Sequence, residues 1–163
     1  MNFKEFLDLH ESKNMDYHVI NKYEPSPNLG YIPLGTKEAR QAEEKFLKGR
    51  LKLKTFLQKQ EVGFRAIING EEYLRSIDGI FVKKTFPLSG HKGTAIGQRE
   101  LYSPATKKRY TKILKDDPEY HTDPITVVGT PTEYRVIDGH HRTQAYKDAG
   151  RKEIPVWIEA PLR

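Results

Sequence analysis

The stretch VIDGHHRTQAYKDAG, residues 136–150, places an acid, a glycine, two histidines and an arginine between an apolar run and a segment of helical composition. Asp138 and Gly139 end the β-prone run, and a helix that begins there can end at Gly150. The pattern predicts a strand that passes through a tight turn directly into a helix. It is the most informative part of the chain.

The start of this predicted helix has the chemistry of a phosphate site. The first N–H groups of a helix carry a partial positive charge, and Gly139 lets a ligand approach the backbone closely. His140, His141 and Arg142 add donors for phosphate oxygens. Asp138 can cap the helix, orient a histidine, or coordinate a phosphate-bound Mg²⁺. The simpler alternative is that Asp138 is a helix cap and the histidines merely fill the first turn.

Helical spacing divides these side chains between two faces. His141, Ala145 and Ala149 follow one another at intervals of four, so they share a face that we expect to pack on a sheet. His141 is therefore predicted to point inward, whereas His140 and Arg142 lie nearer the mouth of the site.

The neighbouring segments continue an alternation of strands and helices. Ser103 and Pro104 predict the start of a helix that reaches residue 117, and the pattern predicts strands at 123–129, 133–138 and 152–160. The glycine-rich segment 87–98 is predicted to be a loop that closes over a site. It lacks the spacing of a P-loop.

The first half of the chain predicts helices followed by a β meander. Helices are expected at 2–12 and, with Thr36 as the cap and a break at Gly49, over 36–60, with a proline-rich loop between them at 24–35. Residues 63–86 predict three antiparallel strands, because Asn69-Gly70 and Asp78-Gly79 are tight-turn pairs.

Composition excludes several classes of chemistry. The 163 residues include no cysteine, which excludes disulfides, zinc–thiolate sites and thiol nucleophiles. The net charge of +6 is compatible with binding to nucleotides or DNA. No apolar window approaches the ~18 residues of a membrane span, and the sequence predicts a cytoplasmic protein without a membrane partner. Its oligomeric state stays open.

The opening stretch also carries a family resemblance. VIDGHHRTQAYKDAGRKEIPVWI (136–158), preceded by PITVVGTPTEY (124–134), resembles the ParB/sulfiredoxin superfamily over approximately residues 80–160. The resemblance implies an α+β fold, a mixed sheet with flanking helices, to which the first part of the chain adds a helical and β-meander extension. It suggests an extension at 1–75 and a ParB/sulfiredoxin-like domain at 76–163.

The residues of the turn distinguish activities within that superfamily. Sulfiredoxins carry a catalytic cysteine where His140 stands here, so their activity is excluded. ParB partition proteins use a G-E-R-R type motif with CTP, and D-G-H-H-R departs from it. The turn is most similar to the branch of free serine kinases and ParB-like nucleases. This resemblance implies that Glu100 is a catalytic base, although a solvated loop carboxylate is the alternative.

Two functional hypotheses follow. The first is a nucleotide-binding enzyme that uses ATP or CTP with Mg²⁺ for kinase- or ATPase-like phosphoryl-group chemistry. Glu100 and Asp138 would be its catalytic residues, and Gly139, His140, His141 and Arg142 would bind phosphate. The second is a ParB-like DNA-binding protein or nuclease under nucleotide control. A binding module without turnover is a third reading, and the basic helix after Ser103 can be either a DNA-phosphate face or a solvated surface.

Overall fold

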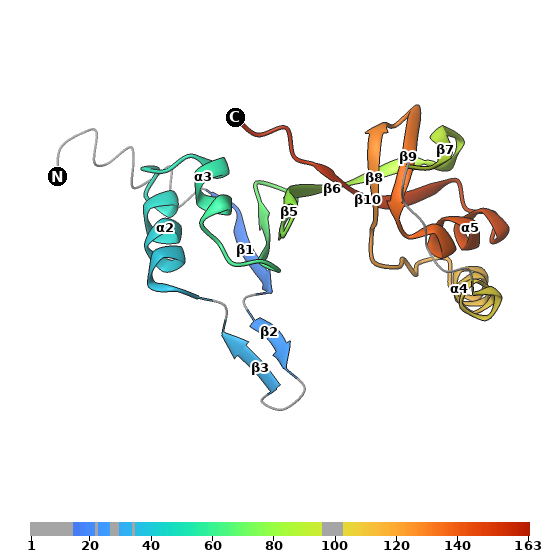
Figure 1. Ribbon diagram of the computed structural model, residues 1–163, viewed down its shortest axis with the longest axis horizontal. Coiled ribbons are helices and arrows are strands. Elements are labelled where there is room, and N and C mark those ends of the chain that lie inside the picture. Colours follow the sequence, from blue (N-terminus) through green and yellow to red (C-terminus); the bar gives the residue numbers. More distant parts are fainter. Residues whose placement is uncertain (1–14, 22, 27–29, 34, 96–102) are drawn as a thin grey trace. The chain divides into compact units, whose positions relative to one another are not determined.

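The computed structural model describes residues 15–21, 23–26, 30–33, 35–95 and 103–163 (Figure 1). The predicted helix at 2–12 and Glu100 lie outside these residues. The chain forms two compact units: unit 1 contains Met1–Val82 and Glu159–Arg163, and unit 2 contains Lys83–Ile158. The predicted division into 1–75 and 76–163 stays a prediction, because compactness alone does not show which part folds independently.

Unit 1 contains the predicted meander. Its strands are antiparallel neighbours in the order β1 (Tyr17–Asn21), β4 (Arg65–Ile68), β5 (Glu71–Ser76) and β6 (Gly79–Pro87). The turn between β4 and β5 has positive φ at Asn69 (51°) and Gly70 (84°), as a tight hairpin turn requires. The three predicted strands are confirmed, and β1 is an additional strand that the sequence analysis missed.

Two helices accompany this meander. They are α2 (Lys37–Leu47) and α3 (Leu53–Gln58), and the predicted break falls at Gly49, where φ is 74°. Thr36 caps α2 by accepting a hydrogen bond from the Ala39 N–H at 3.1 Å.

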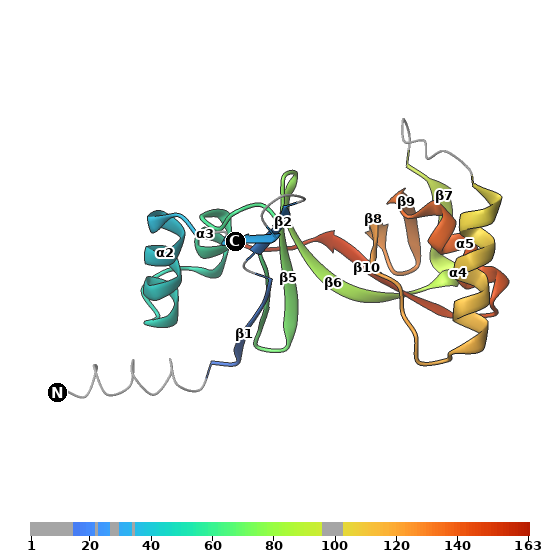
Figure 2. The ribbon, with the colours of Figure 1, turned by 90° about the horizontal axis from the view of Figure 1, so that it is seen from below.

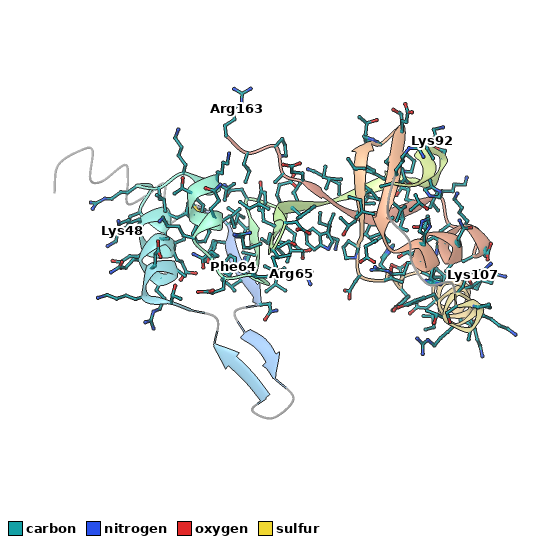
Figure 3. The ribbon with its side chains drawn as sticks, in the orientation of Figure 1. Lys48, Phe64, Arg65, Lys92, Lys107 and Arg163 are labelled. Atoms are coloured by element: carbon teal, nitrogen blue, oxygen red, sulfur yellow. The ribbon has the colours of Figure 1, made fainter. Side chains whose placement is uncertain are left out.

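An aromatic cluster joins these helices to the strands. The rings of Phe46 and Phe56 stack with their centroids 4.4 Å apart, and Phe64 meets Phe56 edge-on at 5.9 Å (Figure 3 labels Phe64). Tyr17 of β1 also contacts Phe56 edge-on, at 6.1 Å. Aromatic contacts therefore link α2, α3 and β1 within unit 1.

The prediction of a loop at 24–35 is wrong. β2 (Tyr23–Ser26) and β3 (Gly30–Pro33) pair antiparallel as a separate two-stranded ribbon. Each strand of a ribbon has one unpaired edge, where a proline without an N–H donor is tolerated. Pro25 and Pro33 are therefore compatible with these paired strands.

Unit 2 contains a mixed sheet and two long helices. Its described elements are β7 (His91–Thr94), α4 (Pro104–Asp116), β8 (Ile125–Thr130), β9 (Glu133–Asp138), α5 (His140–Asp148) and β10 (Glu153–Glu159), with a short 3₁₀ turn at Leu88–Gly90. The strand order is β6-β10-β8-β9-β7. β8 and β9 are antiparallel, whereas β10 runs parallel to β8 and β7 runs parallel to β9. The predicted α+β class with a mixed sheet is confirmed.

The prediction of a loop at 87–98 is wrong for its first part. β7 pairs with β9, and His91 lies opposite Tyr134. Glycine-rich segments have weak intrinsic strand preference, so pairing with a neighbouring strand decides this conformation. Residues 96–98 lie outside the described part of the chain.

The helices α4 and α5 lie side by side in unit 2 (Figure 2). The core beneath them includes Leu114 from α4, Tyr146 from α5 and Val136 from β9, all at most 1% exposed. The Tyr146 hydroxyl accepts a hydrogen bond from the Thr122 N–H at 3.0 Å, which satisfies the polar end of this buried ring. No helix within the described ranges is both long and apolar enough to cross a membrane.

Candidate functional site

The tight turn from β9 into α5 depends on a glycine. Gly139 is the N-cap of α5, with φ of 107° and no capping side chain. A β-carbon at this position would lie 2.3 Å from Ile125 Cγ2, so a larger residue would meet both backbone strain and a clash. Asp138 is the last residue of β9, and the interpretation of Asp138 as the helix cap is therefore wrong.

His141 connects the starts of the two helices of unit 2. Its Nε2 accepts a hydrogen bond of 2.7 Å from the backbone N–H of Ser103, which is the N-cap of α4. The side chain is buried, at 8% exposure, and Ala145 on the same face is fully buried. The predicted inward orientation of His141 is confirmed. Because Nε2 accepts, the neutral ring carries its hydrogen on Nδ1.

His140 connects α5 to β7 on the other side. Its Nε2 is hydrogen-bonded to the hydroxyl of Thr94, the last residue of β7. His91 begins the same strand, and its Nδ1 lies 2.6 Å from Nζ of Lys147 on α5. Burial lowers the pKa of His91 below the usual value of 6.5, and the charges of Lys147 and His140 lower it further. Basic groups therefore gather between β7 and α5.

Arg142 anchors the segment that leads into β8. Its Nη1 donates to the carbonyl oxygens of Asp123 and Pro124 at 2.9 and 3.2 Å. Its Nη2 lies 3.4 Å from Oδ2 of Asp138, a long contact across one helical turn. The Asp138 side chain is 68% exposed, whereas that of Arg142 is 18% exposed. The carboxylate thus faces solvent while the guanidinium is largely enclosed.

The structure brings five of the six predicted site residues into one turn: Asp138, Gly139, His140, His141 and Arg142. The sixth, Glu100, lies outside the described residues. The sequence analysis identified Ser103 only as a cap and did not foresee its contact with His141.

Thr94, His91 and Lys147 also belong to the surroundings of the turn and were missed as site residues. Their only signal was that His91 stands in the glycine-rich segment that was predicted to close over a site. Lys147 carried no signal of its own, because a basic residue in the last turn of a helix is common.

The side chains at the turn could hold a metal ion only if a phosphate ligand supplied further oxygen atoms. Within the described ranges, no three His, Cys, Asp or Glu side chains form a metal-binding group. Mg²⁺ is commonly held by one or two carboxylates with phosphate oxygens and waters, so the exposed carboxylate of Asp138 suits a phosphate-bound ion.

Comparison with protein families agrees with this fold. Residues 119–162 match the family model of the ParB N-terminal domain. This segment includes β8, β9, the turn, α5 and β10. The resemblance of the C-terminal part of the chain to the ParB/sulfiredoxin superfamily is confirmed.

Two solved structures resemble about half of the chain. One is the C-terminally truncated chromosome-partitioning protein ParB from Caulobacter crescentus complexed with CTP-gamma-S, at 20% identity, with 48% of this chain and 44% of that chain covered and a TM-score of 0.39. The other is sulfiredoxin from Arabidopsis thaliana, at 19% identity, with 47% and 83% covered and a TM-score of 0.38. The match thus spans less than half of that ParB chain. No curated protein matches the chain.

Proposed function

We propose that the turn from β9 into α5 binds the phosphate groups of a nucleotide, ATP or CTP, and supports phosphoryl-group chemistry. The observation that carries this proposal is the start of α5 at Gly139, an N-cap that makes no side-chain hydrogen bond to the helix. Helix starts of this kind bind phosphate through backbone donors and the helix dipole.

The basic side chains around the turn support an anionic ligand. His140, His91 and Lys147 lie along the contact between β7 and α5, where burial lowers the pKa of His91 and repulsion from Lys147 and His140 lowers it further. A bound phosphate would relieve this repulsion. Nη1 of Arg142 donates to two carbonyl groups, so we assign this residue a mainly positioning role. Its other N–H groups would contact the phosphate.

His141 has a positioning role in this proposal. Its Nε2 accepts a hydrogen bond from the Ser103 N–H and so fixes the start of α4 against the start of α5. The backbone starts of two helices are thereby held close together in the same unit.

Asp138 and Glu100 complete the proposed chemistry. Asp138 would hold Mg²⁺ on the phosphates through its exposed carboxylate, and the ion would neutralise charge that develops during transfer. Glu100 would take the proton of an acceptor hydroxyl, a role that rests on the family resemblance. The D-G-H-H-R turn favours a kinase- or ATPase-like reaction in this branch.

The test is a titration of the full chain with ATP and, separately, CTP, with and without Mg²⁺. We expect calorimetric heat and a rise in Tm with at least one nucleotide, and tighter binding with Mg²⁺. His140→Ala should weaken binding about tenfold, since it removes a charge-assisted contact. His121→Ala, which changes an exposed histidine outside the turn, serves as the matched control.

Turnover is measured separately from binding. Glu100→Gln should keep nucleotide affinity and lose phosphoryl transfer or hydrolysis by about 100-fold or more. Turnover that survives Glu100→Gln would remove Glu100 from the mechanism. The absence of binding by either nucleotide would overturn the phosphate site itself.

A second candidate function is DNA binding, and the charge of α4 favours it. The hollow along this helix has a volume of about 850 Å³. Five basic side chains of α4 line it: Lys107, Lys108, Arg109, Lys112 and Lys115. Lys107, labelled in Figure 3, pairs with Asp148 at 3.0 Å. Such a face can follow a phosphate backbone, in a DNA-binding protein or a nuclease under nucleotide control.

Salt dependence distinguishes this candidate. If α4 contacts DNA, Lys108→Gln and Lys112→Gln should each lower the slope of log affinity against log salt by about 1. Lys48→Gln, on α2, should leave the slope unchanged. An unchanged slope in both α4 variants would exclude α4 as the DNA-binding face.

A further inference from the structure

Unit 1 contains a hollow that is separate from the phosphate site. It has a volume of about 430 Å³, within the range of small-molecule pockets. Helix α3, the turn between β5 and β6, and the C-terminal residues 159–162 form its wall. The C-terminal segment is held in place because the Ala160 N–H donates to the Ile80 carbonyl at 2.9 Å.

Charged groups of both signs line this hollow. Lys54 comes from α3 and Arg75 from the end of β5, whereas Asp78 lies in the hairpin turn and Glu159 ends β10. Among the described residues, none of these four side chains forms an ion pair. Two positive and two negative groups thus surround one space without neutralising one another.

Arg75 is the most constrained of the four. Its backbone N–H donates to the Phe64 carbonyl at 2.8 Å, and its carbonyl accepts from the Gly63 N–H at 2.7 Å. Its Nη1 donates to the Ser76 carbonyl, while Nε is buried and meets no hydrogen-bond partner within the described chain. A buried donor without a partner is uncommon in folded proteins.

We propose that this hollow binds a small zwitterion that carries a carboxylate and an ammonium group. The carboxylate would lie against Arg75 and Lys54, and the ammonium group against Asp78 and Glu159. Arginine recognises a carboxylate through two parallel hydrogen bonds, which gives the ligand a defined orientation.

The balance of charges excludes other ligand classes. A nucleoside triphosphate or a nucleic acid would be repelled by Asp78 and Glu159, and a polycation would be repelled by Lys54 and Arg75. Gln58, one turn after Lys54 on α3, adds a neutral donor and acceptor. Ile77, at 80% exposure, gives the rim an apolar surface that a ligand could cover.

The test uses a series of zwitterions with increasing charge separation: glycine, β-alanine, 4-aminobutyrate and 6-aminohexanoate. Each is titrated into the full chain by calorimetry at low salt, beside butyrate and butylammonium, which carry one charge only. We expect one member of the series to bind with a Kd of about 1 mM or tighter, and at least about fivefold tighter than either single-charge probe. The lining charges have defined positions, so one spacing should fit best.

Substitutions of two exposed side chains test whether the zwitterion binds in this hollow. Lys54→Gln and Glu159→Gln should each weaken the best probe about tenfold, because each leaves one charge of the ligand without a partner. Lys52→Gln, an exposed lysine immediately before α3 that does not line the hollow, is the matched control and should change affinity less than twofold. Both variants change exposed side chains and keep Arg75, so their folding should be preserved.

Three outcomes would overturn the proposal. They are no binding by any zwitterion, equal binding by butyrate or butylammonium, and undiminished binding in both lining variants. Affinity for ATP and CTP is measured in the same variants and should be unchanged. The zwitterion site and the phosphate site can therefore fail independently.

Discussion

The first N–H groups of α4 and α5 are capped in different ways within unit 2. α4 begins after Ser103, whose hydroxyl accepts from the Thr106 N–H at 3.3 Å. α5 begins after Gly139, which has no side chain to offer and adopts a left-handed backbone conformation. A hydroxyl cap satisfies an N–H group from within the chain, whereas a glycine cap leaves that group available to a ligand.

The difference in capping distinguishes the start of α4, which is structural, from the start of α5, which is the candidate binding site. Ser103 also donates its own N–H to His141 on α5, so the capped start of α4 supports the uncapped start of α5. Basic side chains gather beside α5, where His140, His91 and Lys147 lie together. Stability and ligand binding should therefore respond differently to changes at the two starts.

The largest expected effect is at the glycine cap. Gly139→Ala should lower the free energy of unfolding by about 3 kcal/mol, because the backbone conformation is strained for alanine and the methyl group meets Ile125. Gly150→Ala is the control: φ is also positive there, at 76°, but no atom lies within 4 Å. It should cost about 1 kcal/mol. Urea unfolding of both variants measures the difference, and equal losses would contradict the packing argument.

The second effect tests the link between the two helix starts. His141→Ala should lower the free energy of unfolding by about 2 kcal/mol, since it leaves a cavity and removes the acceptor of the Ser103 N–H. His121→Ala changes an exposed histidine and should cost less than about 0.5 kcal/mol. Chemical denaturation checks both values. Similar stability of the two variants would show that the link contributes little.

The third effect tests the hydroxyl cap alone. Ser103→Ala should cost about 1 kcal/mol in stability, and Ser103→Gly only a few tenths, as at other helix caps. Both changes keep the backbone N–H that contacts His141, so nucleotide affinity should stay within about twofold of the original. A large loss of affinity in Ser103→Ala would mean that the start of α4 itself contacts the ligand.

The smallest expected effect is a pH dependence at the basic cluster. The pKa of His91 in the folded protein lies below the usual value of 6.5 because of burial and the nearby charges of Lys147 and His140. As pH falls below about 6.5, the unfolded chain takes up this proton first, and stability decreases until pH passes the folded pKa. Above about pH 6.5, this contribution is complete.

The matched variant for this effect is His91→Gln. It should reduce the decrease in Tm between about pH 7 and pH 5, measured by thermal unfolding in buffers of equal ionic strength. Parallel Tm profiles for the two proteins would contradict the assignment of this dependence to His91.

The sequence predicted the elements that depend on local patterns. The β4–β5 turn follows from Asn69-Gly70, because few other pairs accept two positive φ values. The start of α4 follows from Ser103-Pro104, and the inward face of α5 follows from the four-residue spacing of His141 and Ala145. Each of these features is encoded by residues close together in the chain.

β7, a strand that depends on a distant partner, was not predicted. β7 contains His91, Lys92, Gly93 and Thr94, a composition with little preference for a strand. It is a strand because it pairs with β9, more than 40 residues later. Likewise, the sequence left open whether Asp138 caps α5, and it did not identify Gly139 as the cap. The close approach of Ile125 and the left-handed backbone decide it in favour of Gly139.

The sequence by itself determined the kind of chemistry that this protein can carry. It excludes cysteine chemistry, places a glycine where a strand enters a helix, and concentrates basic groups and one carboxylate beside it. Only the tertiary structure decided which groups meet. The contacts of His141 with Ser103 and of His140 with Thr94 join residues 38 and 46 positions apart. Such contacts depend on how helices and strands pack, and packing is a property of the whole fold rather than of any local segment.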